Sequence, residues 1–252
     1  MFHLAVLPLA LLAGACLNLE KRPALAGLFI GLLCYNPQLG LLLPLVLIAG
    51  RHWRAFLCAA VTTIAFCAVA TLVFGVENWV AFWNNLPVQQ HNLEAGLLYL
   101  FKMPTMFAAT RMLGGGVTLA YGLQAAVGLA VAVLTLVAWY RRAGTLALRA
   151  SLLAVALMLI SPYAYDYDMV VLALPIALLA ADGLERGWMP GTRTMLAAVW
   201  SAPLFLPALA EHARVQLTPL LLIAFFAIIY RRMRFVVSHQ DTMRAPTAEN
   251  ST

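Results

Sequence analysis

Charged side chains are scarce in this 252-residue sequence, at 10% of its residues, whereas soluble domains carry about 25%. Only ten residues are acidic, and 63% of the chain is hydrophobic. The mean hydropathy is +0.88, a value typical of chains whose long apolar stretches lie in lipid. The composition therefore excludes an ordinary soluble globular domain and predicts a polytopic helical membrane protein.

Motifs for nucleotides, metals and disulfides are missing as well. The sequence has no glycine-rich phosphate loop, dinucleotide fingerprint, serine elbow or metal-spaced set of histidines and cysteines. Its four cysteines lie in apolar runs without a C-x-x-C pair, which is typical of small buried side chains. We therefore expect no metal and no cofactor. The net charge of +6 predicts no nucleic-acid partner, because the basic residues stand in short runs between apolar segments.

Hydropathy divides the chain into about nine apolar segments. They cover residues 2–18, 24–35, 38–50, 55–74, 114–139, 146–161, 169–184, 194–209 and 215–230. The second and third are short for a hydrocarbon core of about 30 Å, because a helix rises only about 1.5 Å per residue. We expect them to form a broken hairpin at 24–50, whose two halves meet at Tyr35-Asn36-Pro37-Gln38 inside the membrane. The predicted fold is an all-α transmembrane bundle over 1–234, followed by a polar, disordered cytoplasmic tail at 235–252.

The basic residues predict the orientation of this bundle. With the hairpin in place, thirteen lysines and arginines fall on one side of the membrane, and only Lys102, Arg111 and Arg214 fall on the other. The side rich in lysine and arginine is normally cytoplasmic. The N-terminus, the hairpin turn and the loops 75–113 and 161–168 then face outward, and the C-terminus is cytoplasmic. Because the chain opens on an apolar segment without a basic anchor, we expect it to be the C-terminal part of a longer protein.

The predicted outer face carries most of the candidate site residues. The simpler interpretation of the loop 75–113 is an interfacial helix anchored by aromatic side chains. The alternative is a polar pocket that contains His91 and Glu94. Lys102 and Arg111 are either solvated charges or cations suited to an anionic lipid headgroup.

A second group of candidates precedes the apolar segment that begins near Met169. Asp166 and Asp168 can cap the start of that helix, or one of them can bind a sugar hydroxyl or act as a base. The tyrosines between and before them, including Tyr165, supply stacking surfaces and hydroxyl donors, as at sugar sites, or form an aromatic belt.

Several stretches together resemble glycosyltransferase family 87. They are residues 27–44 with the basic cluster 51–54, residues 102–114 and residues 161–168, and the similarity extends from about residue 20 to 230. This family comprises membrane enzymes of the GT-C fold that are related to polyprenyl-phosphate-mannose-dependent α-mannosyltransferases. The resemblance implies transfer of a hexosyl or mannosyl group from a polyprenyl-phosphate sugar to an acceptor hydroxyl at the outer face of a bacterial inner membrane. Membrane lipids and the lipid-linked donor are then the partners, and the oligomeric state stays open.

The resemblance also implies roles for individual residues. The family usually has Lys-Pro-Gln where this chain has Asn36-Pro37-Gln38, and the resemblance implies that this turn meets the donor phosphate. Asn36 can donate a hydrogen bond but carries no charge, so the resemblance leaves the cationic part of that contact to Lys102 and Arg111. The implied donor-binding residues are Asn36, Gln38, Lys102 and Arg111, and the implied sugar or acceptor pocket contains Tyr35, His91, Glu94 and Tyr165. Asp168 and Asp166 are the catalytic candidates in this chain. GT-C enzymes place their general base in the first outer loop, which we expect to precede this sequence.

Two interpretations from other classes remain alongside the enzyme. A transporter or flippase would use the broken hairpin as a binding site at the membrane midplane. It would also predict two matching sequence halves and polar residues deep within several segments, whereas polarity here gathers at the outer ends. The other alternative is a non-catalytic remnant that only packs or binds lipid.

Overall fold

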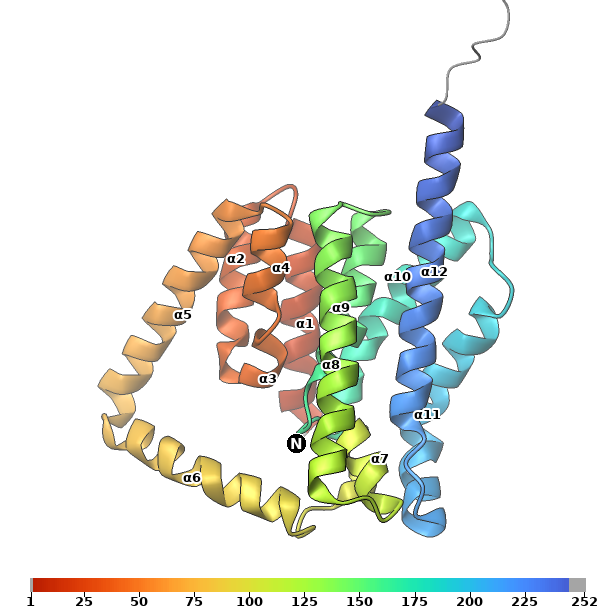
Figure 1. Cartoon of the computed structure of the whole chain (residues 1–252). Coiled ribbons are helices and arrows are strands. Elements are labelled where there is room, and N and C mark those ends of the chain that lie inside the picture. Colours follow the sequence, from red (N-terminus) through yellow and green to blue (C-terminus); the bar gives the residue numbers. More distant parts are fainter. Residues whose placement is uncertain (1, 245–252) are drawn as a thin grey trace, which may run out of the picture.

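The computed structural model describes residues 2–244, which form a bundle of helices without a strand (Figure 1). The helices are α1 (Phe2–Asn18), α2 (Pro23–Leu32), α3 (Pro37–Gly40), α4 (Leu43–Ala49), α5 (Trp53–Phe74), α6 (Glu77–Glu94), α7 (Met106–Met112), α8 (Val117–Tyr140), α9 (Leu146–Ile160), α10 (Ala173–Arg186), α11 (Thr192–Ala213) and α12 (Thr218–Arg244). Short 3-10 turns η1 (Leu33–Tyr35), η2 (Leu100–Lys102) and η3 (Asp166–Leu172) join some of them. The predicted all-α class is confirmed.

Four helical stretches are long and apolar enough to cross a membrane. They are α5, α8, α11 and the continuous stretch Asp166–Arg186, in which η3 runs into α10. Every apolar segment expected from hydropathy is helical, but the segment 38–50 is divided into α3 and α4. At the other end of the chain, α12 continues to Arg244, so residues 235–244 of the expected tail are helical. The rest of that tail, 245–252, lies outside the described residues.

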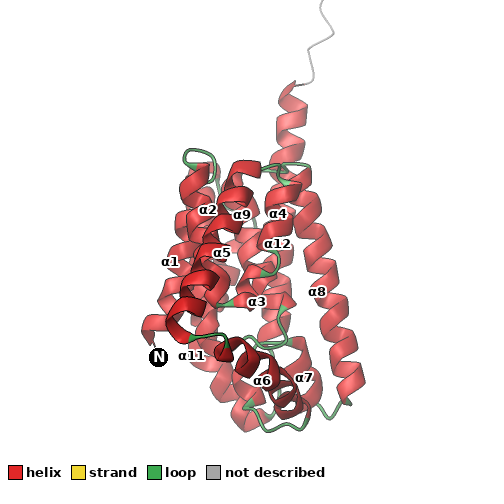
Figure 2. Ribbon diagram, turned by 90° about the vertical axis from the view of Figure 1, so that its left-hand side faces the viewer, coloured by secondary structure: helices red, strands yellow, loops and turns green. Residues whose placement is uncertain are grey.

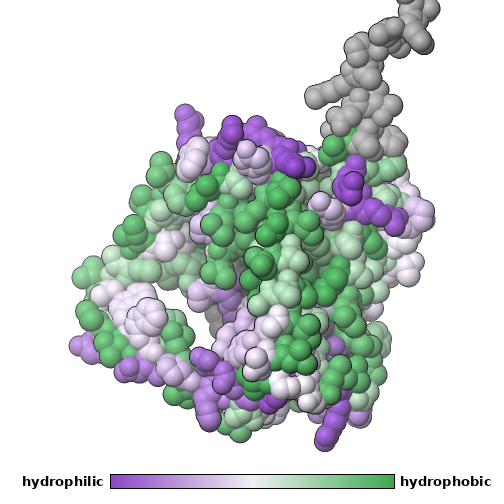
Figure 3. Space-filling view, in the orientation of Figure 1, coloured by the Kyte–Doolittle hydropathy of each residue, from purple (hydrophilic) through white to green (hydrophobic). Residues whose placement is uncertain are grey.

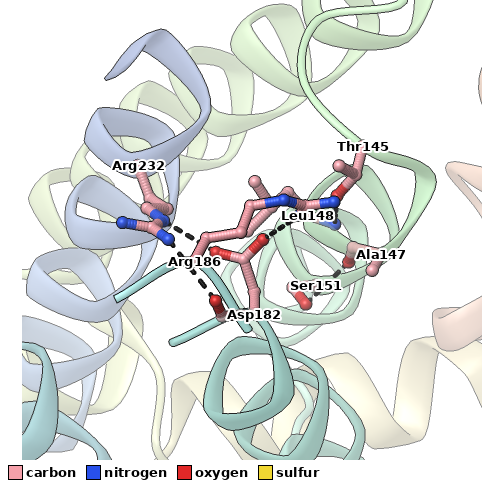
Figure 4. A network of polar contacts seen from close by, with 7 residues as sticks. All are labelled: Thr145, Ala147, Leu148, Ser151, Asp182, Arg186 and Arg232. Atoms are coloured by element: carbon pink, nitrogen blue, oxygen red, sulfur yellow. Dashed lines mark hydrogen bonds and ion pairs between the residues drawn. The ribbon is translucent and has the colours of Figure 1, made fainter. Parts of the chain in front are cut away.

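Helix α9 forms the centre of the bundle, where it is buried from Leu148 to Leu159 and packs against α8, α10 and α12. A helix that is apolar on every side can be covered on every side by protein. Besides the buried Arg149, the polar groups at the start of α9 are the hydroxyls of Thr145, which caps the helix, and of Ser151, and both are satisfied locally, as Figure 4 shows. The Thr145 hydroxyl accepts the Leu148 N–H at 3.3 Å, and the Ser151 hydroxyl donates to the Ala147 carbonyl at 2.8 Å.

The broken hairpin packs against α5 through two glycines of α2. A Cβ atom on Gly27 would lie 2.5 Å from the Ala55 carbonyl oxygen, and one on Gly31 would lie 2.7 Å from the Ala59 carbonyl oxygen. Small residues four apart allow such close backbone approach between membrane helices. Figures 1 and 2 show α3, which follows the hairpin turn, between the two ends of the bundle and above α6 and α7. The chain therefore breaks at the depth that hydropathy predicted.

Replacing Gly31 with alanine is expected to destabilise the protein, because the new methyl group would also lie 2.5 Å from the Thr62 Cβ. Overpacking of this kind typically costs about 1–3 kcal/mol. Gly122→Ala in α8 is the matched control, since nothing lies within 4 Å of its added Cβ. Thermal unfolding in detergent, followed by tryptophan fluorescence, measures both variants. Equal midpoints for the two would contradict the close α2–α5 contact.

Polar residues gather at the two ends of the bundle, with a hydrophobic band between them (Figure 3). The loops α1–α2, α4–α5 and α8–α9, which carry many of the basic residues, lie together at the upper end of Figure 1. At the lower end, α6 runs across the bundle and exposes Trp79, Phe82 and Trp83. The first part of the segment expected as an interfacial helix is thus a helix, α6, at one end of the hydrophobic band.

A buried ion pair, which the sequence analysis did not identify, joins α10 to α12 (Figure 4). The Arg232 Nε donates to the Asp182 Oδ2 at 2.7 Å, and both side chains are almost fully buried. Arg186 binds the other carboxylate oxygen from its more exposed position one turn along α10. Asp182 thereby compensates a cation that would otherwise be buried without a partner.

Candidate functional site

The hairpin turn meets the loop 161–168 although the two are far apart in the sequence. The Ser161 hydroxyl donates to the Gln38 Oε1 at 2.9 Å and accepts the Tyr163 N–H at 3.1 Å. Ser161 is buried, so this contact fixes the turn against the end of α9. Two segments that the sequence analysis assigned to one side of the membrane are therefore joined directly.

Asp168 is the buried carboxylate of this region, with 5% of its surface exposed. Its Oδ2 accepts the Tyr165 N–H at 2.9 Å, the geometry of a helix cap at the start of η3. This bond does not use the other carboxylate oxygen. Asp166 is only half-buried, and its Oδ1 accepts the Tyr167 N–H at 2.8 Å. Both aspartates thus serve the local backbone, and burial distinguishes Asp168 from Asp166.

The Tyr35 hydroxyl is buried and has no hydrogen-bond partner in the part of the chain that the structure describes. It lies close enough to Asp168 for the two to interact electrostatically. The adjacent Asn36 precedes α3 at the N-cap position, but its side chain makes no cap hydrogen bond. A buried hydroxyl without a partner is costly, and a ligand that accepts a hydrogen bond would remove that cost.

Tyrosine side chains connect this region to the lower end of the bundle. The Tyr165 and Tyr167 rings are stacked, with centroids 5.5 Å apart and planes 4° from parallel. Burial, and then the neighbouring Asp166, raise the pKa of Tyr165, so its hydroxyl stays protonated at neutral pH. Tyr165 also packs against a small core that contains Leu93 and Phe107. The loop 161–168 therefore contacts both the hairpin turn and the segments around α6 and α7.

The other candidates lie in that second region. Arg111 donates to the carbonyl oxygens of Glu94 and Gly115, each at 3.0 Å, so its guanidinium ties α7 to the end of α6. Lys102 is exposed, and its ammonium lies 5.6 Å from the Tyr99 ring centroid. His91 is exposed on α6. Of these two candidate cations, Lys102 is the one whose charge is free to meet a ligand at the surface.

Glu94 and Tyr121 link the two groups of candidates. The half-buried Glu94 carboxylate accepts from the Gln90 amide at 2.8 Å and also interacts with Tyr121, which in turn interacts with Tyr163 of the loop 161–168. Glu94, together with Arg111 that binds its carbonyl oxygen, is therefore linked to this loop, whereas His91 and Lys102 are exposed on neighbouring segments. Within the described residues 2–244, no group of three or more His, Cys, Asp or Glu side chains is placed to hold a metal ion.

An apolar cavity of about 600 Å³ adjoins the hairpin turn. Pro37 of the turn, Ile30 of α2 and Leu43 of α4 line one side, and Phe56 and Thr63 of α5 line the other. Figure 3 shows the opening between the α5–α6 arm and the rest of the molecule. The polar turn and an apolar chamber thus lie next to each other within the hydrophobic band.

Two buried glutamines, which the sequence analysis overlooked, position the lower region. Gln124 of α8 donates to the carbonyl oxygens of Leu159 and Ile160 and accepts the Phe107 N–H at 3.1 Å. Gln216 donates to the carbonyls of Phe101 and Met103. The sequence did contain an indication of these contacts, because a glutamine inside an apolar segment must find a hydrogen-bond partner within the protein. Apart from the Thr218 hydroxyl, which donates to Gln216, their partners are backbone groups, which sequence motifs do not reveal.

The long apolar helices and the hydrophobic band indicate an integral membrane protein. The model of glycosyltransferase family 87 matches residues 4–162, more than half of the chain. The chain therefore belongs to glycosyltransferase family 87. No curated protein and no solved structure matches it significantly. The matched region includes the hairpin turn, Lys102, Arg111 and Ser161, and it ends just before Asp166 and Asp168. Membership in this family favours a sugar transferase over a transporter.

Proposed function

We propose that this glycosyltransferase moves a hexosyl group, specifically mannosyl, from a polyprenyl-phosphate donor to an acceptor hydroxyl at the outer face of a bacterial inner membrane. One observation carries the proposal. The Tyr35 hydroxyl, which has no partner among the described residues, interacts with the Asp168 carboxylate, and Pro37 of the same turn lines an apolar cavity. A lipid-linked sugar needs both a polar site for its headgroup and an apolar space for its chain.

The reaction is a displacement at the anomeric carbon of the donor sugar. Asp168 takes the proton of the acceptor hydroxyl, whose oxygen attacks that carbon while the bond from the sugar to the phosphate oxygen breaks. Polyprenyl phosphate leaves with the electron pair of that bond. The Tyr35 hydroxyl and the amides of Asn36 and Gln38 are the donors available to the phosphate, and hydrogen bonds to its growing charge favour departure.

The lipid chain of the donor would occupy the apolar cavity beside Pro37. Its volume of about 600 Å³ falls in the usual range of small-molecule sites, so it would hold the first isoprene units, and the rest would extend into the bilayer. The basic end of the bundle would face the cytoplasm, which directs α6 and the loop 161–168 outward.

A transfer assay tests this proposal. The full chain would be reconstituted in nanodiscs with radiolabelled polyprenyl-phosphate mannose and a membrane lipid extract as the source of acceptor. We expect labelled product from this donor and none from radiolabelled GDP-mannose. Transfer from the nucleotide sugar would overturn the proposal. Donor binding without any transfer would assign the chain to the class of non-catalytic remnants.

Restoring the lysine of the family at the turn is expected to strengthen donor binding. In Asn36→Lys, a charge-assisted hydrogen bond to the phosphate replaces a neutral one and is roughly twice as strong.

Lys102→Ala is expected to weaken donor binding a few-fold and to reduce the dependence of that binding on salt, because an exposed cation acts through a field that salt screens. The exposed Arg214→Ala is the matched control. Equal donor affinities for Asn36→Lys, Lys102→Ala and wild type in titrations of labelled donor would argue against this phosphate site.

A further inference from the structure

A second cavity, of about 590 Å³ and lined by charged side chains, lies at the basic end of the bundle, away from the apolar cavity at the hairpin turn. It opens where the loops α1–α2, α4–α5 and α8–α9 meet, the loops seen at the top of Figure 1. Its walls carry four arginines and a single carboxylate, namely Arg51, Arg54, Arg142, Arg149 and Glu20. The proposed transfer reaction uses none of these residues.

Arg149 is the buried member of this group. It is only 7% exposed, and its Nε is buried without a hydrogen-bond partner among the described residues. Its nearest carboxylate oxygen, on Glu20, lies 3.9 Å away on a side chain that is 60% exposed. The guanidinium lies over the Trp139 ring, 5.5 Å from the centroid. A buried cation with so distant a counter-ion carries an uncompensated desolvation cost.

The position of Arg149 in its helix adds to that cost. Arg149 lies in the first turn of α9, where the partial positive charge of the helix dipole favours anions and disfavours cations. The apolar composition of α9 provides no acidic residue in that turn. An anion in the cavity would compensate both the guanidinium and the helix end.

Two other arginines of the cavity hold a backbone conformation that favours glycine. Arg51 has φ of 59° and Arg142 has φ of 50°, and each lies two residues beyond the last residue of a helix, α4 in one case and α8 in the other. A left-handed conformation costs a non-glycine residue about 1–2 kcal/mol. Only one other non-glycine residue among those described, Arg214, has a positive φ. Arg51 and Arg142 are each the left-handed residue of a helix C-cap, closed by the His52 N–H to the Leu47 carbonyl in one case and by the Ala143 N–H to the Ala138 carbonyl in the other. Both caps therefore place an arginine on the same cavity.

We propose that this cavity binds a phosphate group, supplied either by the headgroup of an anionic phospholipid or by phosphate in solution. One guanidinium group can donate two parallel hydrogen bonds to two oxygens of the same phosphate, because their spacings match. Trp53, which lines the cavity, is exposed, and so is Leu57 one turn further along α5. Basic pockets between membrane helices, at the end where the helices meet the lipid headgroups, commonly bind those headgroups.

Ligand binding to delipidated protein in detergent tests the proposal. The ligands are short-chain phosphatidylglycerol, short-chain phosphatidylcholine and inorganic phosphate, and binding is followed by titration and by the thermal midpoint. We expect Arg149→Gln to weaken binding at least about tenfold, because it removes a buried charged donor. Tighter binding of phosphatidylglycerol than of phosphatidylcholine identifies a lipid source. Binding of inorganic phosphate without that preference identifies a soluble one.

Arg51→Gly provides a variant whose two effects have opposite signs. Glycine relieves the left-handed conformation, so the unliganded protein should become more stable, while loss of the charge should weaken phosphate binding several-fold. The matched control is Arg214→Gly, which has φ of 54° in the wild type and lies at the opposite end of the bundle. It should gain stability with unchanged binding. Unchanged affinity in both Arg149→Gln and Arg51→Gly, or no binding of either ligand by the wild type, would overturn the proposal.

His52 gives a second readout that does not depend on sugar transfer. Burial, followed by the charges of Arg149 and Arg142, lowers its pKa, while Glu20 opposes them. The other charged neighbours at the cavity are Arg51 and Arg54. A bound phosphate would offset the field of these arginines, so the pKa of His52 should rise toward its usual range when inorganic phosphate or phosphatidylglycerol is added. Titration of the imidazole by NMR, with Arg149→Gln as the comparison, measures this shift, and a pKa that stays unchanged under saturating ligand would count against the site.

Discussion

Replacing Asp168 with asparagine is expected to slow sugar transfer by about 10²-fold or more, the usual scale of general-base assistance. The fold should persist, because the amide oxygen of asparagine can still accept the Tyr165 N–H that the Asp168 Oδ2 accepts at 2.9 Å. What the substitution removes is the negative charge and the basicity needed to take a proton from the acceptor hydroxyl. A cap and a base therefore respond differently to the same change.

Asp166→Asn is the matched control for this experiment. It also keeps its local acceptor for the Tyr167 N–H, but it changes a half-buried carboxylate, so we expect a smaller effect on transfer. Initial rates with the polyprenyl-phosphate mannose donor, together with the thermal midpoint of each variant, separate chemistry from folding. Wild-type turnover in Asp168→Asn would assign this residue to the cap alone, and the catalytic carboxylate would have to be sought elsewhere.

The second large effect is expected at the buried ion pair between α10 and α12. Asp182→Leu removes the carboxylate that the Arg232 Nε contacts at 2.7 Å and leaves a buried cation without compensation. Loss of one partner of such a pair typically costs about 3–5 kcal/mol in the free energy of unfolding. The double variant Asp182→Leu, Arg232→Met should recover most of that loss, because no unpaired charge remains.

Arg186→Met is the control within the same cluster. Its side chain is 46% exposed, and ion pairs of exposed groups contribute about 1 kcal/mol or less. Unfolding by denaturant titration in detergent micelles would measure all four proteins. A double variant that is less stable than Asp182→Leu alone would show that Arg232 contributes through packing and not through its charge.

The sequence predicted the helices because long apolar runs have few alternatives in a membrane. It could not predict which of them lie at the centre. Helices α5 and α9 are both almost wholly apolar, yet α9 is buried throughout while α5 is covered on little more than its glycine-facing side. Lipid tails are as apolar as leucine, so hydropathy does not distinguish a helix surrounded by protein from one surrounded by lipid.

The candidate site was predictable in parts but not as an arrangement. The pattern Asn-Pro-Gln indicated a break at the turn, and the tyrosine-rich loop indicated a second polar region, but their junction at Gln38 and Ser161 depends on tertiary packing. Arg111 shows the opposite case. Its charge suggested a headgroup ligand, whereas its hydrogen bonds go to backbone carbonyls of Glu94 and Gly115, which no side-chain pattern encodes.

Helix α6 keeps two parts of the molecule at a set spacing. Gly75, with φ of 84°, turns the chain from α5 into α6, and at the other end Arg111 holds the last carbonyl of α6. The eighteen residues between these two joints form a rod of about 27 Å. Because a helix resists compression, the length of α6 holds the lower end of α5 away from α8. It thereby maintains the opening between the α5–α6 arm and the rest of the molecule (Figure 3). The number of helical turns in α6 thus sets the width of this opening, from outside the hairpin turn and the loop 161–168.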